Sequence, residues 1–216
     1  MRPDPAADVG AHAALDRIAE GLGGGGYAVV PAYIDPTLVR RLRERARAFD
    51  AAGAFTDARV GRSAASVRRA DIRGDRIRWL DEGDADAAER GLREALEPVR
   101  AAANRTLALG AFDVELHYAV YPPGAGYARH VDAFRDDDAR VLSCVVYLNE
   151  DWRTADGGAL RLWRADGSAL EVEPRGGTLA VFLADRVEHE VLPALRERWS
   201  VTGWFRRRSV AGSVAR

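Results

Sequence analysis

Lysine and glutamine are missing from this 216-residue sequence, so all 32 of its basic residues are arginine. Without a lysine amine, the chain cannot form the Schiff bases of pyridoxal-phosphate enzymes and other lysine-based catalysts. It also lacks the phosphate-binding lysine of P-loop nucleotidases and the strand lysine of protein kinases. An anion that binds here through a fixed positive charge must therefore be held by arginine, whose planar guanidinium suits bidentate contact with a carboxylate.

Cysteine and long apolar runs are scarce as well. The single cysteine, Cys144, can form no disulfide within the chain, which fits a reducing compartment. No apolar run approaches the roughly 20 residues of a membrane span, and the N-terminus lacks the apolar core of a signal peptide. The formal net charge of −1 gives no electrostatic reason for nucleic-acid or anionic-membrane binding. We therefore expect a cytoplasmic protein with no nucleic-acid partner and no membrane partner.

The first half of the sequence has a helical pattern. Residues 1–10 are rich in proline, alanine and aspartate, and we expect them to be disordered. Three amphipathic helices are predicted, over 12–22, from the Asp35-Pro36 pair to about Phe49, and over 86–107. Pro98 predicts a kink or a break in the third helix. A short strand is expected at 27–30, after a run of glycines.

After Gly110 the sequence changes to short segments of alternating polarity that are separated by turn signals. The expected strands are 112–121, 141–148, 159–163, 170–172, 178–183, 188–192 and 198–205. This spacing is typical of an antiparallel sandwich or barrel. Because the helices precede the strands, the predicted class is α+β, with helices supporting one sheet core. We expect one domain over 11–208, divided into helical support and a lid (11–109) and a strand core (110–208), followed by a tail (209–216).

Two of the four histidines stand in a pattern that suits a metal ion. His130 and Asp132 are two residues apart, so in an extended segment their side chains point to the same face. His189, on a separate predicted strand, could complete the set. Two imidazoles and one carboxylate on one face leave three positions open, which is the facial triad of non-haem Fe(II) oxygenases. The H-x-D pair alone is a weak signal, because strand histidines more often have structural roles.

Arg198 strengthens this interpretation. It follows His189 by nine residues, beyond a predicted turn, so the returning strand can direct its guanidinium into the same pocket. Three open metal positions and an inward arginine suit a co-substrate that chelates iron through a 2-oxo acid and carries a second carboxylate. 2-Oxoglutarate has both groups. The sequence therefore favours an oxygenase that depends on Fe(II) and 2-oxoglutarate.

Several longer stretches resemble the prolyl-hydroxylase-domain branch of the 2-oxoglutarate/Fe(II) oxygenases. That branch includes the oxygen-sensing hydroxylases of hypoxia-inducible factor and bacterial relatives that act on elongation factor Tu. The stretches are YPPGAGYARHVD (121–132), VVYLNEDW (145–152), GGALRLW (157–163), HEVLPALRERWSVTGWF (189–205), GAFTD (53–57) and ADIRGDRIRW (70–79). The resemblance starts at about residue 14 and implies a double-stranded β-helix, or jelly-roll, core buttressed by the N-terminal helices.

The resemblance also implies roles for single residues. His130, Asp132 and His189 match the iron ligands. The positions that match the 2-oxoglutarate pocket are Arg198 and Tyr147, which hold the far carboxylate, and Tyr121, Thr202 and Trp204, which line the walls. Arg73 and Asp75 match the root of a mobile loop, placed here over 57–75, that covers the substrate proline. Tyr127 is a further substrate-side position.

Some positions depart from the family pattern. The turn between Tyr121 and His130 is one residue shorter than in the animal enzymes, which affects the alignment of Tyr127. His117 lies where an apolar residue is expected, and we interpret it as a pocket-wall residue rather than a ligand. His12 is interpreted as a surface residue. The central loop stretch 60–69 matches nothing closely, so the resemblance says least about the target.

The implied activity is hydroxylation of a prolyl residue in a protein, by analogy at C4. Fe(II), 2-oxoglutarate and O2 would take part, succinate and CO2 would be released, and ascorbate would keep the iron reduced. Elongation factor Tu is one possible protein partner. Two alternatives stay open: an oxygenase that hydroxylates a free amino acid or another small metabolite, and a non-catalytic metal-binding sensor. A sensor has no use for Arg198, and a DNA-repair dealkylase would carry a second arginine where this sequence has Trp204.

Overall fold

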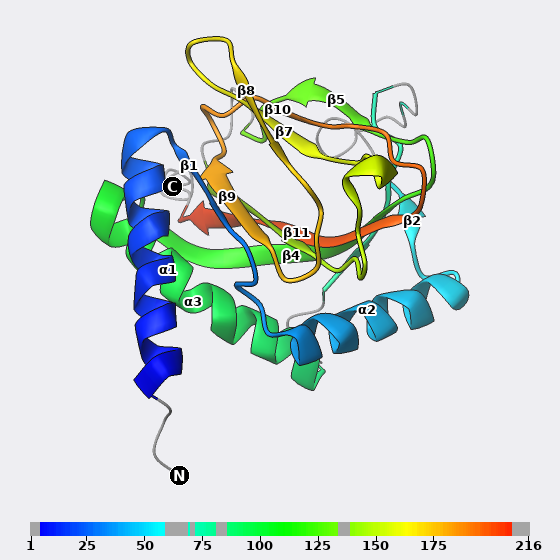
Figure 1. The fold of residues 1–216 in the computed structure, drawn as a ribbon, viewed down its shortest axis with the longest axis horizontal. Coiled ribbons are helices and arrows are strands. Elements are labelled where there is room, and N and C mark those ends of the chain that lie inside the picture. The colour runs from blue at the N-terminus through cyan, green and yellow to red at the C-terminus, as the bar shows by residue number, and fades with distance from the viewer. Residues whose placement is uncertain (1–4, 59–68, 70–71, 81–85, 134–138, 209–216) are drawn as a thin grey trace, which may run out of the picture.

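The computed structural model describes residues 5–58, 69, 72–80, 86–133 and 139–208, shown in Figure 1. The helices are α1 (Pro5–Gly24), α2 (Pro36–Ala51) and α3 (Ala87–Leu107). The strands are β1 (Tyr27–Val30), β2 (Thr56–Asp57), β3 (Arg76–Trp79), β4 (Ala111–Tyr121), β5 (Tyr127–His130), β6 (Arg140–Tyr147), β7 (Leu160–Trp163), β8 (Ala169–Val172), β9 (Leu179–Leu183), β10 (His189–Val191) and β11 (Arg198–Arg207). Every strand predicted after residue 110 is present, with its ends shifted by at most two residues.

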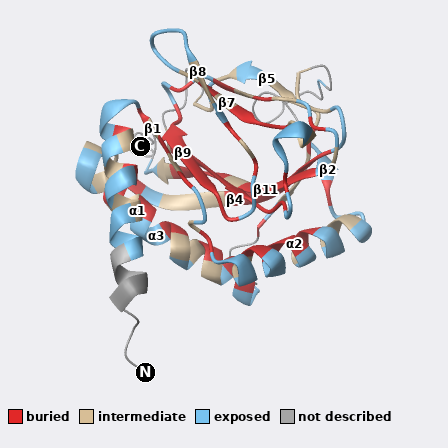
Figure 2. Ribbon diagram, in the orientation of Figure 1, coloured by how far each residue is buried: buried red, intermediate tan, exposed pale blue. Residues whose placement is uncertain are grey.

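The strands form two antiparallel sheets. The larger sheet has the order β1-β9-β6-β11-β4-β3-β2, and the smaller has the order β5-β10-β7-β8. In Figure 1 the smaller sheet lies on one side of the larger, and α2 and α3 lie on the other. Figure 2 shows that the central strands are buried while the outer faces of the helices are exposed. This arrangement confirms the predicted α+β class.

Capping residues and proline set the course of α2 and α3. The Asp35 carboxylate accepts a hydrogen bond of 2.7 Å from the backbone amide of Thr37, and Pro36 occupies the first turn of α2. Asp86 caps α3 in the same way, at 2.7 Å from an amide of the first turn. Pro98 lies inside α3, which continues to its end without a break. The predicted alternative of a helix split at this proline is therefore wrong.

The first helix begins earlier than predicted. It starts at Pro5, so the expectation of disorder over 1–10 is wrong for residues 5–10, while residues 1–4 lie outside the described residues. Proline is well tolerated in the first turn of a helix, and the alanines that follow have the highest helix propensity. The predicted tail, 209–216, also lies outside the described residues. No helix in the described ranges is long and apolar enough to cross a membrane.

Strand β4 separates the helix-packed core from the space between the sheets. On one face, the Tyr118 hydroxyl donates a hydrogen bond of 3.1 Å to Glu89 of α3. The alternate side chains, from His117 to Tyr121, point the other way and line a cavity between the sheets. The same alternation on β11 directs Arg198, Thr202 and Trp204 into that cavity.

Three short strands, β2, β3 and β5, are not predicted by the sequence pattern. β2 pairs with β3, β3 pairs with the edge of β4, and β5 pairs with β10. The predicted loop over 57–75 is therefore wrong at its start, because Asp57 lies in β2, and its centre lies outside the described residues. These strands have only two to four residues, so even where polar and apolar side chains alternate, as in β3, the pattern is too short to stand out in the sequence.

Candidate active site

The smaller sheet brings the two candidate histidine ligands together. His130 ends β5, His189 begins β10, and the two residues are directly paired across these strands. The Asp132 carboxylate lies 3.5 Å from Nε2 of His130 and 3.7 Å from Nε2 of His189. One ligand atom of each residue lies within 4.8 Å of the other two. The three side chains thus converge on one point, as a single metal ion requires.

Backbone carbonyls fix the orientation of both imidazole rings. Nδ1 of His130 lies 2.7 Å from the carbonyl oxygen of Ala128, and Nδ1 of His189 lies 3.1 Å from that of Val187. A carbonyl oxygen can only accept a hydrogen bond, so each Nδ1 must carry the proton. Each Nε2 then keeps its lone pair for a metal ion, as is usual for metal-binding histidines.

Ser143 of β6 connects the third candidate ligand to the larger sheet. Its hydroxyl donates a hydrogen bond of 2.6 Å to Oδ2 of Asp132. Burial alone would raise the pKa of Asp132, but His189, His130 and this hydrogen bond together hold that pKa well below its ordinary value. Burial also lowers the pKa of His189. A carboxylate and two imidazoles form the donor set that suits Fe(II), so the residues present fit this metal.

Arg198 and Tyr147 form a second polar centre, away from the three ligands. The Arg198 side chain is buried, and its Nε donates a hydrogen bond of 2.8 Å to the carbonyl oxygen of Gly158. Its guanidinium lies 5.2 Å from the ring of Tyr121 and 5.1 Å from that of Tyr147. The Tyr147 hydroxyl is buried without a hydrogen-bond partner among the described residues. A ligand carboxylate would satisfy both groups.

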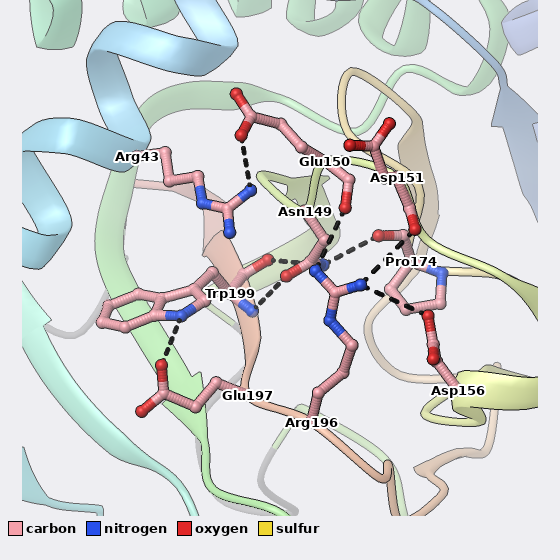
Figure 3. Close-up of polar contacts among 9 residues, drawn as sticks. All are labelled: Arg43, Asn149, Glu150, Asp151, Asp156, Pro174, Arg196, Glu197 and Trp199. Carbon is pink, nitrogen blue, oxygen red and sulfur yellow. Dashed lines mark hydrogen bonds and ion pairs between the residues drawn. The ribbon is translucent and has the colours of Figure 1, made fainter.

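A network of polar contacts holds the start of β11, from which Arg198 projects (Figure 3). The Asn149 amide oxygen accepts a hydrogen bond of 2.7 Å from the backbone amide of Trp199, and its nitrogen donates one of 3.1 Å to the Trp199 carbonyl. On the other side, Arg196 donates to the backbone carbonyls of residues 150 and 151. These contacts fix the backbone immediately before and after Arg198.

One cavity between the sheets collects almost all of the candidate site residues. Of the residues that the sequence indicates, those lining the cavity are His130, Asp132, His189, Arg198, Tyr121, Thr202, Trp204, Arg73, Asp75 and Tyr127. Tyr147 does not line the cavity but lies against Arg198. The walls are completed by His117 and by apolar residues, among them Val145, Leu160 and Phe182. The cavity therefore has polar groups at two ends and apolar walls between them.

The three candidate substrate residues lie beside the metal ligands. Arg73 donates two hydrogen bonds to the buried Asp75, from Nε to Oδ1 at 2.7 Å and from Nη2 to Oδ2 at 2.9 Å. The Arg73 guanidinium lies 4.9 Å from the ring of Tyr127, and this ring stacks on His130 at 3.6 Å. All three line the cavity that holds the candidate metal ligands, which suits contact with a substrate, and that role stays a prediction.

A larger groove, of about 1140 Å³, lies between the ends of α1, α3 and β9. It includes Arg129 and Val131, which flank His130, but none of the three candidate ligands. Its size alone does not make it the active site. The converging ligands and the buried arginine all lie in the smaller cavity.

Ser143, Asn149 and Gly158 are site residues that the sequence reasoning missed. Ser143 and Asn149 are polar residues in or beside an apolar strand, and a buried polar side chain must find a partner. Gly158 has a φ of +70°, and a Cβ there would lie 2.8 Å from the Cβ of Ala194. The sequence contains these signals, but it does not show which groups they contact.

Comparisons with known proteins agree with this geometry. Residues 116–206 match the sequence model of the 2OG-Fe(II) oxygenase superfamily. The crystal structure of a Pseudomonas putida prolyl-4-hydroxylase is 46% identical to this chain, with a TM-score of 0.81, and the match covers 90% of this chain and 100% of that one. The chain belongs to the prolyl hydroxylase family of 2OG-Fe(II) oxygenases. Human prolyl hydroxylase EGLN3 is 31% identical over 175 residues, which cover 75% of this chain and 70% of that protein.

Two further members of the prolyl hydroxylase family complete the comparison. Human Egl nine homolog 1 is 32% identical over 202 residues, which cover 89% of this chain and 46% of that protein. The chain thus spans about half the length of the Egl nine homologues that it matches. A Trichoplax adhaerens prolyl hydroxylase, solved with a peptide fragment of hypoxia inducible factor, is 23% identical, with a TM-score of 0.84 and 94% coverage of both chains. These likenesses confirm the predicted double-stranded β-helix core.

Proposed function

We propose that this protein is a dioxygenase that uses Fe(II) and 2-oxoglutarate to hydroxylate a prolyl residue of a protein at C4. The observation that carries this proposal is a single cavity with two histidines and one carboxylate on one side and a buried arginine on the other. The prolyl hydroxylases among the relatives support the substrate class.

The metal side of the cavity would hold Fe(II) on one face. His130, Asp132 and His189 would supply three ligands and leave three adjacent positions open. Bound iron, with 2-oxoglutarate and O2, supplies the oxidation: the co-substrate loses CO2, one oxygen atom enters succinate and the other enters a C–H bond of the proline. The protein's part is to hold the ligands in place, which Ser143 and the backbone carbonyls do.

The arginine side of the cavity would bind the far carboxylate of 2-oxoglutarate. Arg198 presents a fixed fork of donors, and its Nε is already held by Gly158. Burial raises the pKa of Tyr147 to about 12, so its hydroxyl keeps the proton at neutral pH and can donate a hydrogen bond. Burial raises the pKa of Tyr121 as well. The contacts of Arg198 and Tyr147 with this carboxylate would form away from bulk water, where charge-assisted hydrogen bonds are strongest.

The protein substrate would approach over Arg73, Asp75 and Tyr127, which lie beside the metal ligands. The Trichoplax adhaerens prolyl hydroxylase is in complex with a peptide fragment of hypoxia inducible factor, which supports a peptide rather than a small metabolite here. Elongation factor Tu is the proposed candidate, because the sequence resembles bacterial family members that act on it. A cytoplasmic location and a dependence on ascorbate are parts of the same proposal.

Turnover of 2-oxoglutarate tests this function. Succinate release is measured with Fe(II) and ascorbate, alone and after addition of elongation factor Tu, other proline-containing proteins or free proline. We expect one of the proteins to stimulate succinate release, and a version with the target proline changed to alanine to lose this effect. Stimulation by free proline or another small metabolite, with none by any protein or peptide, would contradict the proposal and favour the metabolite hydroxylase.

A further inference from the structure

His117 of β4 is a buried histidine whose ring lies close to the rings of two tryptophans. Its side chain is 1% exposed, and its ring centroid lies 5.0 Å from that of Trp79 and 5.3 Å from that of Trp204. Neither ring nitrogen has a hydrogen-bond partner among the described residues. Buried polar groups are nearly always paired, because an unpaired one costs free energy. A ligand in the adjoining cavity would remove this cost.

Three such buried polar groups surround the same cavity. The ring of His117 and Nε1 of Trp204 belong to residues that line it, and the third group is the hydroxyl of Tyr147, whose ring lies against the guanidinium of Arg198 behind the cavity wall. All three lack a hydrogen-bond partner within the described ranges of the chain. Their common location indicates that the cavity binds a ligand with polar atoms in more than one place.

The strand pairing places His117 toward the metal side of the cavity. On β4, Tyr121 is paired with Arg198, whereas His117, four residues away, is paired with Thr202. Four residues of extended strand span about 13 Å, so His117 and Arg198 face different parts of a bound ligand. Trp204, on which His117 stacks, is paired with Ser143, the residue that holds Asp132.

The protonation state of His117 suits a hydrogen-bond donor to an anion. Burial, followed by the positive charges of Arg73 and Arg140, lowers the pKa of His117 to about 3. The ring is therefore neutral at physiological pH, with one nitrogen that donates and one that accepts. The apolar residue that the family resemblance leads us to expect at this position could not donate at all.

We propose that His117 is a co-substrate-binding residue, whose ring N–H donates a hydrogen bond to the carboxylate beside the keto group of 2-oxoglutarate. This inference rests on the proposed function. The dicarboxylate would then have a protein donor for each carboxylate, with Arg198 and Tyr147 at the far one and His117 at the near one. His117 would thereby fix how the keto acid is presented to the metal.

Binding to the zinc-loaded protein tests this inference without turnover. Dissociation constants for 2-oxoglutarate are measured by titration calorimetry for the wild type, His117→Met and His117→Gln. Met preserves the packing between the tryptophans but cannot donate, so we expect binding to weaken on the order of 10-fold, the effect of one hydrogen bond to a charged group. Gln should restore part of the affinity. Zinc affinity should not change, and His12→Met, at an exposed position of α1, should bind as the wild type does.

A shorter ligand locates the contact. 2-Oxobutyrate keeps the keto acid but lacks the far carboxylate, so His117→Met should weaken its binding by the same factor as that of 2-oxoglutarate. Arg198→Ala should weaken the binding of 2-oxoglutarate only. Unchanged affinity of a folded His117→Met for both ligands would overturn the role of His117. If the wild type binds 2-oxoglutarate equally well without the metal, or does not bind it at all, that result would instead contradict the proposed function.

A measurement on the wild type does not depend on how the variants fold. In the zinc-loaded protein with isotope-labelled histidine, NMR can follow the ring N–H of His117, because burial protects this proton from exchange with water. We expect the His117 signal to move downfield when 2-oxoglutarate is added, as a new hydrogen bond to a carboxylate requires. A His117 signal that stays unchanged at saturating 2-oxoglutarate would overturn the inference.

Discussion

The two ends of the cavity are built by different means. At the arginine end, Arg198 and Tyr147 project from long strands of the larger sheet and are almost completely buried. At the metal end, His130 and His189 belong to strands of only four and three residues in the smaller sheet. The side chain of His130 is also more exposed, at 17%. One end lies entirely in the core, and at the other end one ligand, His130, is partly exposed.

This difference matches what each end has to do. Under the proposed function, the co-substrate carboxylate can be enclosed completely, and a rigid, dry site would make its contacts with Arg198 stronger. A metal that must act on a protein chain has to lie where that chain can reach it. Under the proposed function, the smaller sheet would provide this access, while Ser143 of the larger sheet donates a hydrogen bond to Asp132. Variants at each end should therefore have separable effects on metal and co-substrate binding.

The largest effect is expected from removing a ligand at the metal end. Substitution of a residue that orients a metal ligand lowers metal affinity by about 10–100-fold. Removal of a ligand itself should have a larger effect, so His189→Ala should lower Fe(II) affinity by at least about 100-fold and abolish turnover. Metal content after dialysis measures this loss, with His12→Ala as the control. Unchanged metal content in the His189 variant would contradict the proposed ligand set.

At the arginine end, Arg198→Ala should affect the co-substrate and spare the metal. Loss of a bidentate charged contact should raise the dissociation constant of 2-oxoglutarate on the order of 100-fold. Calorimetry on the zinc-loaded protein measures this constant, and the zinc affinity of the same sample is its internal control. If a folded Arg198→Ala variant loses affinity for both zinc and 2-oxoglutarate, the two ends of the cavity do not act separately.

A smaller effect is expected when the link between the sheets is cut. Ser143→Ala removes the hydrogen bond to Asp132 and should weaken metal binding by about 10-fold. Ser200→Ala is a matched control, since Ser200 is equally buried but its hydroxyl contacts Thr202 instead. Equal metal affinity in the two variants would show that Ser143 does not position the ligand.

The smallest effect on 2-oxoglutarate binding is expected from Asn149, which holds the backbone next to Arg198. Asn149→Ala leaves both backbone groups of Trp199 without their partner and should cost about 2 kcal/mol of stability. It should also weaken 2-oxoglutarate binding, to a smaller extent than Arg198→Ala. Asn104 holds both backbone groups of Ala111 in the same way, at the end of α3, so Asn104→Ala should lose similar stability with unchanged binding. Equal binding in the two asparagine variants would contradict a positioning role for Asn149.

Residue spacing predicts much of the fold and of the candidate site. The strands of the second half alternate clearly enough to be found, and the two-residue spacing of His130 and Asp132 places both side chains on one face. Arg198 is found because it lies on the strand after His189. In each case the signal is local, or depends only on the order of neighbouring strands.

The parts that the sequence does not predict depend on distant partners. Strand β3 pairs with the edge of β4, and its alternation of arginine with Ile77 and Trp79 is too short to indicate a strand without that partner. Likewise, the roles of Ser143 and Asn149 follow from cross-strand register, which apolar patterns do not specify. His117 is noticed in the sequence as an oddity, but only the structure shows that its ring lies beside the cavity with no hydrogen-bond partner in the part of the chain that is described.

The most direct test of the account is to measure succinate and hydroxyproline in the same reaction. The enzyme is incubated with Fe(II), 2-oxoglutarate and a protein that stimulates turnover, and tandem mass spectrometry then locates added oxygen in that protein. The account predicts one hydroxylated proline for each succinate above background, and neither product with His189→Ala. Succinate released in step with an oxidised residue other than proline, or with a hydroxylated small metabolite, would contradict it.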